Sequence, residues 1–486
     1  MAGFFVIGEQ KVRPGLYYRY ENRGLPPLAG VDDGKCAAVF RSNWGPLGRP
    51  IVIENFGDIN RFYGDGGEAG TTDVPLEQFR GGARRVFCIR LGNENSGTHG
   101  EYQISDTDGN AVIKLILIHP GSRKFNITIR PTLADPNRGE LLILEGTTAI
   151  ERITFDTSAG IDQVTSLIDA VTATGSSYFS LTNITPEPVP ENPVINTLAV
   201  VDQEAIAPGT DPAITVAEYT AAFEALESSR WNVLSIDTDD LDVHIMTQMY
   251  LNRVYQSGKY VMGVIGEDSE VDFETRLKHA AAYNDYQLIY VGGGYTDMEG
   301  NAHEGWRASA RIAGMIAGTP SNESVTRLPI TGAVELTERL TNYEYEQSLL
   351  SGMLTFSTSS ADTVWIEQGI NSLVMPGTKE DDGWKKIKRV KIRFELFQRI
   401  NDTLERLIGR INNDSDGRMT VIQLINGVCN AMVAEKKLLP GAHGAVDTDN
   451  PPKGDSAWFL ILADDIDAFE KGYFKFEFRF APDETT

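Results

Sequence analysis

Four carboxylates lie within six residues of this sequence, at Asp237, Asp239, Asp240 and Asp242. They follow a buried-type strand, Trp231 to Ile236, and α/β sheets bind ligands at the carboxyl ends of their strands. Such oxygen ligands could hold Mg²⁺ or Ca²⁺. The segment lacks the glycine of an EF-hand loop, and Asp240 and Asp242 also suit the N-terminus of a helix. We therefore expect capping and solvation here, and no metal site.

The loops after the next two predicted strands offer no cofactor site. Gly266 to Glu270 is too acidic to attract a phosphate group. The run Gly292-Gly293-Gly294 resembles a nucleotide-binding loop, but it has neither a G-x-G-x-x-G frame nor a P-loop lysine. We expect a mobile turn at these glycines and no bound cofactor.

Catalytic motifs are also missing from the sequence. The six histidines are scattered, and His303-Glu304 lacks the second histidine of H-E-x-x-H. There is no G-x-S-x-G elbow either. We expect the histidines to lie on the surface or to be satisfied in the core, and we predict no catalytic residue.

One cluster stands out by its charge. Between Trp384 and Arg399 the only acidic residue is Glu395, whereas seven residues are basic: Lys385, Lys386, Lys388, Arg389, Lys391, Arg393 and Arg399. Apolar residues alternate with charged ones over Lys388 to Leu396, which predicts a strand with one buried face. The charged face is either an ordinary solvated surface or an electrostatic contact with an acidic partner or a neighbouring copy.

Strands and helices alternate from residue 213 to 320. Helices are predicted over Val216 to Ser228, Val243 to Ser257 and Asp272 to Tyr283, each followed by a short apolar strand. This alternation is typical of βαβ units with a parallel sheet. The chain as a whole is predicted to be a multidomain α/β and α+β protein. The expected parts are an N-terminal arm (1–30), the first part of a body domain (31–97), an inserted β-rich domain (98–200), the α/β domain (201–345), a C-terminal domain (346–465) and a C-terminal arm (466–486). The proline-rich stretch 185–193 is expected to be a loop or linker.

Both arms contain strand-like, aromatic sequences. Near the C-terminus four phenylalanines alternate with charged residues, namely Phe474, Phe476, Phe478 and Phe480. The N-terminal counterpart follows Pro14-Gly15 and contains Leu16, Tyr17, Tyr18 and Tyr20. An apolar strand with an open edge tends to aggregate, so we expect each arm to pair with another sheet.

Composition narrows the classes of partner. At 486 residues the chain should form two to four domains, and its net charge of −24 disfavours binding to nucleic acid or anionic membranes. Three widely spaced cysteines favour a reducing compartment. No signal peptide or transmembrane segment is predicted, so we expect a soluble protein made in a cytoplasm.

Collinear motifs resemble one family, the contractile tail sheath proteins of phages and of phage-like bacteriocins. The similar segments are 13–18 (RPGLYY), 36–47 (CAAVFRSNWGPL), 79–86 (FRGGARRV), 310–318 (ARIAGMIAG), 329–332 (PITG), 367–373 (EQGINSL), 399–402 (RIND) and 407–414 (LIGRINND). The resemblance is weakest over 98–200, where such proteins often carry insertions.

The resemblance implies a structural, non-enzymatic subunit without a cofactor. Copies would stack helically around an inner tail tube and contract to drive it through a cell envelope, with baseplate and tail terminator proteins as further partners. The terminal arms would add strands to sheets of neighbouring subunits, and Lys385 to Arg399 would contact the tube or another subunit. The particle would be a virion tail or a phage-tail-like particle assembled in the host cytoplasm.

Two other classes of protein are compatible with parts of the sequence. An α/β enzyme or nucleotide-binding protein could use the 213–320 sheet, since such folds support many activities. A non-contractile tail or shell protein is the second alternative, although it would not need two strand arms.

Overall fold

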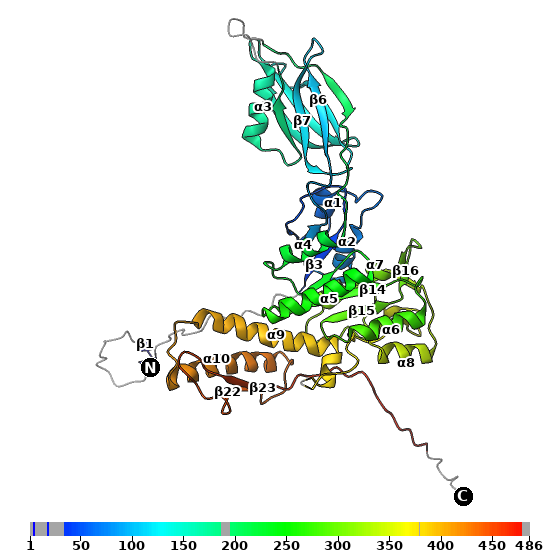
Figure 1. Cartoon of the computed structure of the whole chain (residues 1–486), viewed down its shortest axis with the longest axis vertical. Helices are drawn as coiled ribbons and strands as arrows, with labels where there is room; N and C mark the ends of the chain where they lie inside the picture. Colours follow the sequence, from blue (N-terminus) through cyan, green and yellow to red (C-terminus); the bar gives the residue numbers. More distant parts are fainter. Residues whose placement is uncertain (1–2, 5–16, 19–33, 186–194, 379, 479–486) are drawn as a thin grey trace. The chain divides into compact units, whose positions relative to one another are not determined.

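The computed structural model describes residues 3–4, 17–18, 34–185, 195–378 and 380–478 (Figure 1). The chain divides into a larger unit, 33–394 with 465–486, and a smaller unit, 1–32 with 395–464. Three predicted arm residues, Leu16, Tyr20 and Phe480, lie outside the described residues, as do residues 186–193 of the proline-rich stretch.

A seven-stranded sheet forms the centre of the larger unit. Its strand order is β19-β15-β14-β13-β3-β5-β4, and every neighbouring pair is parallel except β4 with β5. The strands are β3 (Lys35–Phe40), β4 (Ile51–Ile53), β5 (Arg85–Arg90), β13 (Val233–Ser235), β14 (Met262–Glu267), β15 (Leu288–Gly292) and β19 (Met353–Leu354). The predicted parallel α/β sheet is therefore confirmed. The sheet also draws β3, β4 and β5 from the segment 31–97.

Helices cover both faces of this sheet. They are α1 (Asp58–Tyr63), α2 (Asp73–Gly81), α4 (Val216–Leu226), α5 (Leu241–Gln256), α6 (Phe273–Tyr283) and α7 (Gly305–Gly318). Ala37 of β3 packs in the same apolar core as α4 and α5, whereas Cys36 beside it donates from Sγ to the carbonyl of Ala313 on α7. Because successive strand residues point to opposite faces, α4 and α5 lie on one side and α7 on the other.

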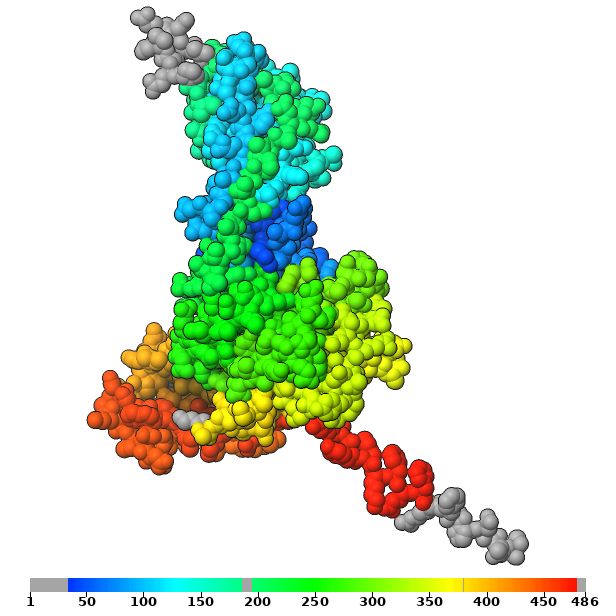
Figure 2. All heavy atoms as spheres, turned by 45° about the vertical axis from the view of Figure 1, so that its right-hand side comes forward, coloured from blue at the N-terminus to red at the C-terminus, as the bar shows by residue number. Residues whose placement is uncertain are grey.

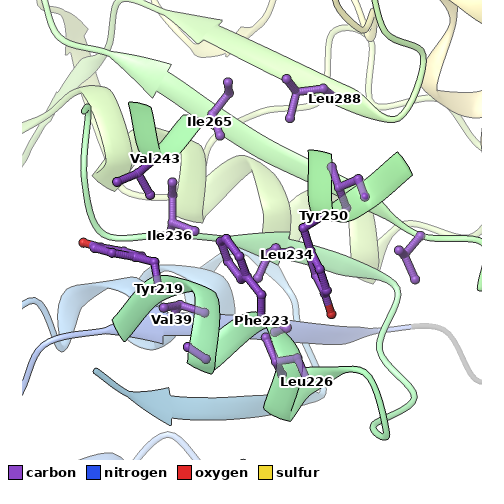
Figure 3. Close-up of a cluster of buried hydrophobic side chains, with 14 of the residues drawn as sticks. Val39, Tyr219, Phe223, Leu226, Leu234, Ile236, Val243, Tyr250, Ile265 and Leu288 are labelled. Carbon is purple, nitrogen blue, oxygen red and sulfur yellow. The ribbon is translucent and has the colours of Figure 1, made fainter. Parts of the chain in front are cut away.

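The core between the sheet, α4 and α5 consists of aliphatic and aromatic side chains (Figure 3). Phe223 of α4 stacks on Tyr250 of α5 with ring centroids 4.9 Å apart. Leu234 and Ile265 project toward these helices from the sheet. Burial of such side chains contributes roughly 1.5–3 kcal/mol each, so this core holds the βαβ units together.

Two antiparallel sheets and one helix form the β-rich part that we predicted over 98–200, and one sheet extends past that range with β12 (Val201–Ala205). One sheet has the order β10-β9-β8-β12 and the other β11-β7-β6. Their bounds are β6 (His99–Ser105), β7 (Ala111–Pro120), β8 (Asn126–Pro131), β9 (Arg138–Glu145), β10 (Thr148–Asp156), α3 (Gln163–Thr174), β11 (Phe179–Asn183) and β12 (Val201–Ala205).

Smaller elements complete the larger unit. A three-stranded sheet contains β16 (Tyr295–Asp297), β17 (Ala302–His303) and β18 (Ala333–Leu336), and a hairpin pairs β20 (Phe356–Thr358) with β21 (Val364–Ile366). Helix α8 spans Asn342–Leu350.

Two long helices and two short sheets belong to the remaining chain. Helix α9 (Ile387–Leu404) begins in the larger unit and continues into the smaller one, which also contains α10 (Ser415–Ala434). The smaller unit pairs β22 (His443–Val446) with β23 (Phe459–Leu462), and β1 (Gly3–Phe4) with β2 (Tyr17–Tyr18).

The strand predicted over Lys388 to Leu396 is wrong, because these residues lie in α9. The helix buries two stripes, one through Val390 and Phe394 and the other through Ile392 and Leu396. Each stripe has the four-residue spacing of a helix face. Since the stripes are offset by two residues, together they imitate the alternation of a strand.

No helix among the described residues is long and apolar enough to span a membrane. The three cysteines, Cys36, Cys88 and Cys429, are free and buried.

Candidate assembly interface

The carboxylates at the end of β13 are used inside the fold. Asp237 is fully buried and accepts hydrogen bonds from Arg41 Nε (2.8 Å), Thr71 Oγ1 (2.5 Å) and Tyr219 Oη (2.6 Å). Three separate segments thereby meet at one side chain. Burial and the Asp237 carboxylate raise the pKa of Tyr219, so the phenol stays a donor to Asp237.

The other carboxylates of this loop act mainly as helix caps. Asp240 accepts from the backbone N–H of Asp242 at 2.8 Å at the start of α5, as the sequence predicts. Asp239 accepts from the N–H of Trp306 at 2.7 Å, at the start of α7, and burial raises its pKa to about 7. Within the described residues, no group of three or more His, Cys, Asp or Glu side chains could hold a metal ion.

The glycine run after β15 is not the mobile turn that we predicted. Gly292, Gly293 and Gly294 are buried. A Cβ on Gly292 would lie 2.2 Å from Sδ of Met353 on β19, and one on Gly294 would lie 2.2 Å from the carbonyl oxygen of His303. Gly292 and Gly294 therefore permit close packing against neighbouring strands.

The histidines nearest the sheet have partners in the fold. His244 is buried with Nε2 3.0 Å from the carbonyl of Thr238, and burial lowers its pKa to about 4. His303 Nε2 lies 3.0 Å from Asp297 Oδ2, and His279 Nδ1 lies 2.9 Å from Glu267 Oε2. These contacts fit the predicted structural role.

The basic cluster 385–399 is neutralised largely within the chain. Lys386, Arg389 and Arg393 form ion pairs with carboxylates of the segment 465–470, and Arg399 pairs with Glu395 and Glu435. The remaining partners are Asp382 for Lys385, and the carbonyls of Ile316 and Thr319 for Lys391. Lys388 is 7% exposed, and its burial lowers the pKa of its ammonium group.

Most of the basic charge of residues 385–399 is therefore already paired inside the described part of the chain. The sequence carried a signal for the internal pairing, because Asp465, Asp467 and Glu470 form an acidic run that matches the basic one. The prediction that these residues contact the tube or another subunit remains a prediction.

The C-terminal aromatic residues are among the most exposed apolar side chains of the described chain. Phe474, Phe476 and Phe478 are 79%, 77% and 90% exposed, and residues 471–478 belong to no helix or strand (Figure 2, red). At the other terminus, Tyr17–Tyr18 pairs in parallel with Gly3–Phe4.

A second apolar surface, which the sequence reasoning missed, lies on the hairpin β22–β23. Its strands pair only with each other among the described residues. Gly444 of β22 packs against α10, where its N–H donates to Asn426 Oδ1 at 2.8 Å. On β23, Leu460 and Leu462 are 48% and 49% exposed. The alternation of half-buried and exposed apolar residues from Phe459 to Leu462 could have indicated a strand that is apolar on both faces.

Comparison with known proteins identifies the class. Residues 213–372, which include β13, β14 and β15 of the central sheet, match the family described as the phage tail sheath protein central domain. The match assigns this segment to a domain of phage tail sheath proteins. This match confirms the resemblance to tail sheath proteins that we inferred from the motifs.

Similarity to individual proteins extends over nearly the whole chain. It is 24% identical to YqbK of Bacillus subtilis (strain 168), over 98% of this chain and 100% of YqbK. Its fold is similar to the sheath tail protein DSY3957 of Desulfitobacterium hafniense, with a TM-score of 0.68 and 17% identity over 93% of this chain and 100% of that one. It is also similar to the helical sheath of the anti-feeding prophage in its contracted state, with a TM-score of 0.52 and 11% identity over 96% and 99% of the two chains.

Proposed function

We propose that this chain is the repeating subunit of a contractile tail sheath. Many copies form a helical homo-oligomer around an inner tail tube, and contraction drives the tube through the envelope of a target cell. The anti-feeding prophage protein of similar fold forms a helical sheath with a contracted state, which supports this proposal. Baseplate and tail terminator proteins are the further partners, and the particle is a virion tail or a phage-tail-like particle assembled in the host cytoplasm.

In this proposal the subunit is structural and carries out no reaction. Side chains of the protein itself occupy the carboxyl edge of the central sheet, where an α/β enzyme would bind its ligand. Asp237 and Asp239 there hold Arg41, Thr71, Tyr219 and the start of α7. No observation favours the enzyme or the non-contractile shell.

One observation carries the proposal furthest: within the described residues, an apolar strand sequence has no pairing strand and the hairpin β22–β23 has only two strands. Phe474, Phe476 and Phe478 lie at every second position, so an extended backbone would place them on one face. Because these side chains are exposed, they contribute no burial energy to the subunit as described. Burying each against another subunit would contribute roughly 1.5–3 kcal/mol.

The hairpin β22–β23 is the proposed acceptor of this strand. A two-stranded hairpin is marginally stable alone, and additional strands would complete it. The exposed side chains of Leu460 and Leu462 could pack across from incoming phenylalanines. Main-chain hydrogen bonds to the open edge would link the copies, which is β-augmentation.

Linking one arm to the next copy's hairpin generates an open chain of subunits. The donor and acceptor surfaces differ, so the contact is heterologous and does not need to close. The N-terminal residues Leu16, Tyr17, Tyr18 and Tyr20 are the proposed second arm.

Truncation tests this proposal. A chain ending at Lys471 lacks the aromatic strand and should stay as subunits, whereas a chain ending at Ala481 keeps all four phenylalanines and should form long ribbed tubes in negative-stain images. Normal tubes from the shorter chain would refute the role of the arm. Uniform small particles from both chains and from the full-length protein would instead favour the enzyme.

A mixing experiment separates donor from acceptor. The variant Leu460→Lys with Leu462→Lys should fail to polymerise, although its arm is intact. When it is mixed with the chain ending at Lys471, its arm should still bind that chain's unaltered hairpin and form discrete dimers in size-exclusion chromatography. If the mixture contains only single subunits, β22–β23 is not the acceptor.

A further inference from the structure

The C-terminal segment is fastened to helix α9 before its aromatic part begins. We define residues 465–470 as the arm root. Arg389 binds Asp465 through two hydrogen bonds, with Nε 2.7 Å from Oδ2 and Nη2 2.7 Å from Oδ1. Arg393 Nη2 adds a contact of 3.2 Å to Oδ1. The Asp465 side chain is only 7% exposed, so it depends on these two arginines.

The far end of the arm root is held as firmly. Glu470 accepts from Thr326 Oγ1 at 2.8 Å and from Gln368 Nε2 at 2.7 Å, and Lys386 Nζ lies 3.1 Å from its Oε2. Lys386 also contacts Asp467 at 2.7 Å. Glu470 is thus the meeting point of three segments, and its side chain is 9% exposed.

The positions of the three basic residues allow them to contact the arm root together. Arg389 and Arg393 are four residues apart on α9, so they lie on one face, and Lys386 directly precedes the helix. A bidentate arginine–carboxylate pair fixes direction as well as distance. Burial alone would raise the pKa of Asp465, but hydrogen bonds from Arg389 and Arg393 outweigh it and lower that pKa.

The exposed part of the C-terminal segment begins shortly after Glu470. Tyr473 is 91% exposed, and the three phenylalanines that follow are exposed too. Between the anchored and the exposed residues stand Lys471 and Gly472, and glycine permits the widest range of backbone angles.

We propose that the stripe Lys386, Arg389 and Arg393, together with Thr326 and Gln368, is a binding site for the acidic arm root. It fixes the origin of the C-terminal arm on the body of its own subunit and places the hinge of the arm at Lys471–Gly472. A pull on the arm then passes through Asp465 into α9, and through Glu470 into Thr326, Gln368 and Lys386. The proposed function supplies only what the arm binds, and the anchor itself is a property of one subunit.

Spin-label mobility in unassembled full-length chain tests this inference. A nitroxide is placed on a cysteine substituted at Ala468, inside the root, or at Phe474, beyond the hinge; the three native cysteines are buried. We expect a restricted spectrum at position 468 and a several-fold shorter rotational correlation time at position 474. Equal mobility at both positions would overturn the proposal.

Variants locate the anchor. Arg389→Ala with Arg393→Ala should release position 468, so that its correlation time approaches that of position 474. The pair Asp465→Asn with Glu470→Gln should do the same without altering α9. The matched control Arg339→Ala removes an exposed arginine from its ion pair with Glu335 and should change neither label. An unchanged spectrum at 468 in both anchor variants would overturn the proposal.

The two proposals fail separately. If the labels behave as expected but the chain ending at Lys471 polymerises normally, the anchor stands and the arm's role in the sheath is wrong. If position 468 is mobile while that truncation abolishes tubes, the arm links subunits without an anchored root.

Discussion

Glu77 on α2 and Arg311 on α7 form an ion pair that the two helices bury between them. Arg311 Nε and Nη2 lie 2.7 Å and 2.6 Å from Glu77 Oε2, and the two side chains are 1% and 6% exposed. Arg80 adds a contact of 2.6 Å to the other carboxylate oxygen. The pair therefore joins an early helix of the chain to the domain matched by the sheath family.

Replacing Glu77 with Gln should destabilise the protein by about 3 kcal/mol, because it leaves the Arg311 charge buried without a counter-ion. Chemical denaturation followed by circular dichroism measures the loss. Glu335→Gln is the matched control, because its pair with Arg339 is solvent-exposed and should contribute less than about 1 kcal/mol. Equal losses of unfolding free energy in the two variants would show that the buried pair contributes no more than the exposed one.

Gly314→Ala should destabilise the protein by about 2 kcal/mol or more. Alanine normally favours a helix over glycine by about 1 kcal/mol, so propensity predicts the opposite sign. A Cβ at this position, however, would lie 2.1 Å from the carbonyl oxygen of Gln78 and would force α2 and α7 apart. The measurement is the midpoint of thermal or urea unfolding.

The control for this prediction is Gly377→Ala in an exposed loop. Its new Cβ would meet only the flexible Glu380 side chain, at 3.5 Å or more. We expect a change within about 0.5 kcal/mol there. A Gly314 variant as stable as this control would mean that the two helices can separate freely.

Asp239→Asn should change how stability depends on pH. Burial raises the Asp239 pKa to about 7, above the value of about 3.9 expected in the unfolded chain. Between these values the folded state binds more protons, so the contribution of Asp239 to stability is present at low pH and declines as pH rises to 7. Asparagine does not titrate, so the variant should gain on the natural protein by about 1–3 kcal/mol from pH 4 to pH 8.

Urea denaturation of both proteins at several pH values provides the measurement. His244 contributes a slope of opposite sign, because its pKa of about 4 lies below the unfolded value of about 6.5 and its stabilisation is lost as pH falls. That contribution is common to both proteins and cancels in the difference. Parallel pH profiles would contradict the prediction.

Sequence periodicity was sufficient for the α/β part of the fold. The strands around Leu234, Val264 and Ile289 are short and apolar, and each preceding helix shows an amphipathic pattern, so local signals and tertiary structure agree. The caps agree too, since Asp240 and Asp272 start helices as their positions suggested.

Sequence periodicity led to a wrong prediction where a helix is buried on more than one face. Helix α9 buries residues on two stripes, and no local signal separates their sum from a strand. The prediction for glycines 292–294 failed for another reason. Their close neighbours, Met353 and His303, belong to other strands, which the local sequence does not reveal. The conformation of Phe474 to Phe478 does not follow from the local sequence either, because a strand forms only with the partner that completes its hydrogen bonds.

The pairing of β3 with β13 has a consequence for biosynthesis. β5 can pair with one edge of β3 early, but Cys36 lies opposite Val233 at the other edge, so the ribosome must add roughly 200 residues before β3 gains its second neighbour. At about 5–20 residues per second this delay amounts to about 10–40 s. Meanwhile the β-rich domain emerges and can fold first, while Val39 still lacks the side chains of α4 and α5 that cover it in the finished protein. A strand that is almost entirely buried in the finished protein is thus one that a chaperone would have to shelter while the rest of the sheet is synthesised.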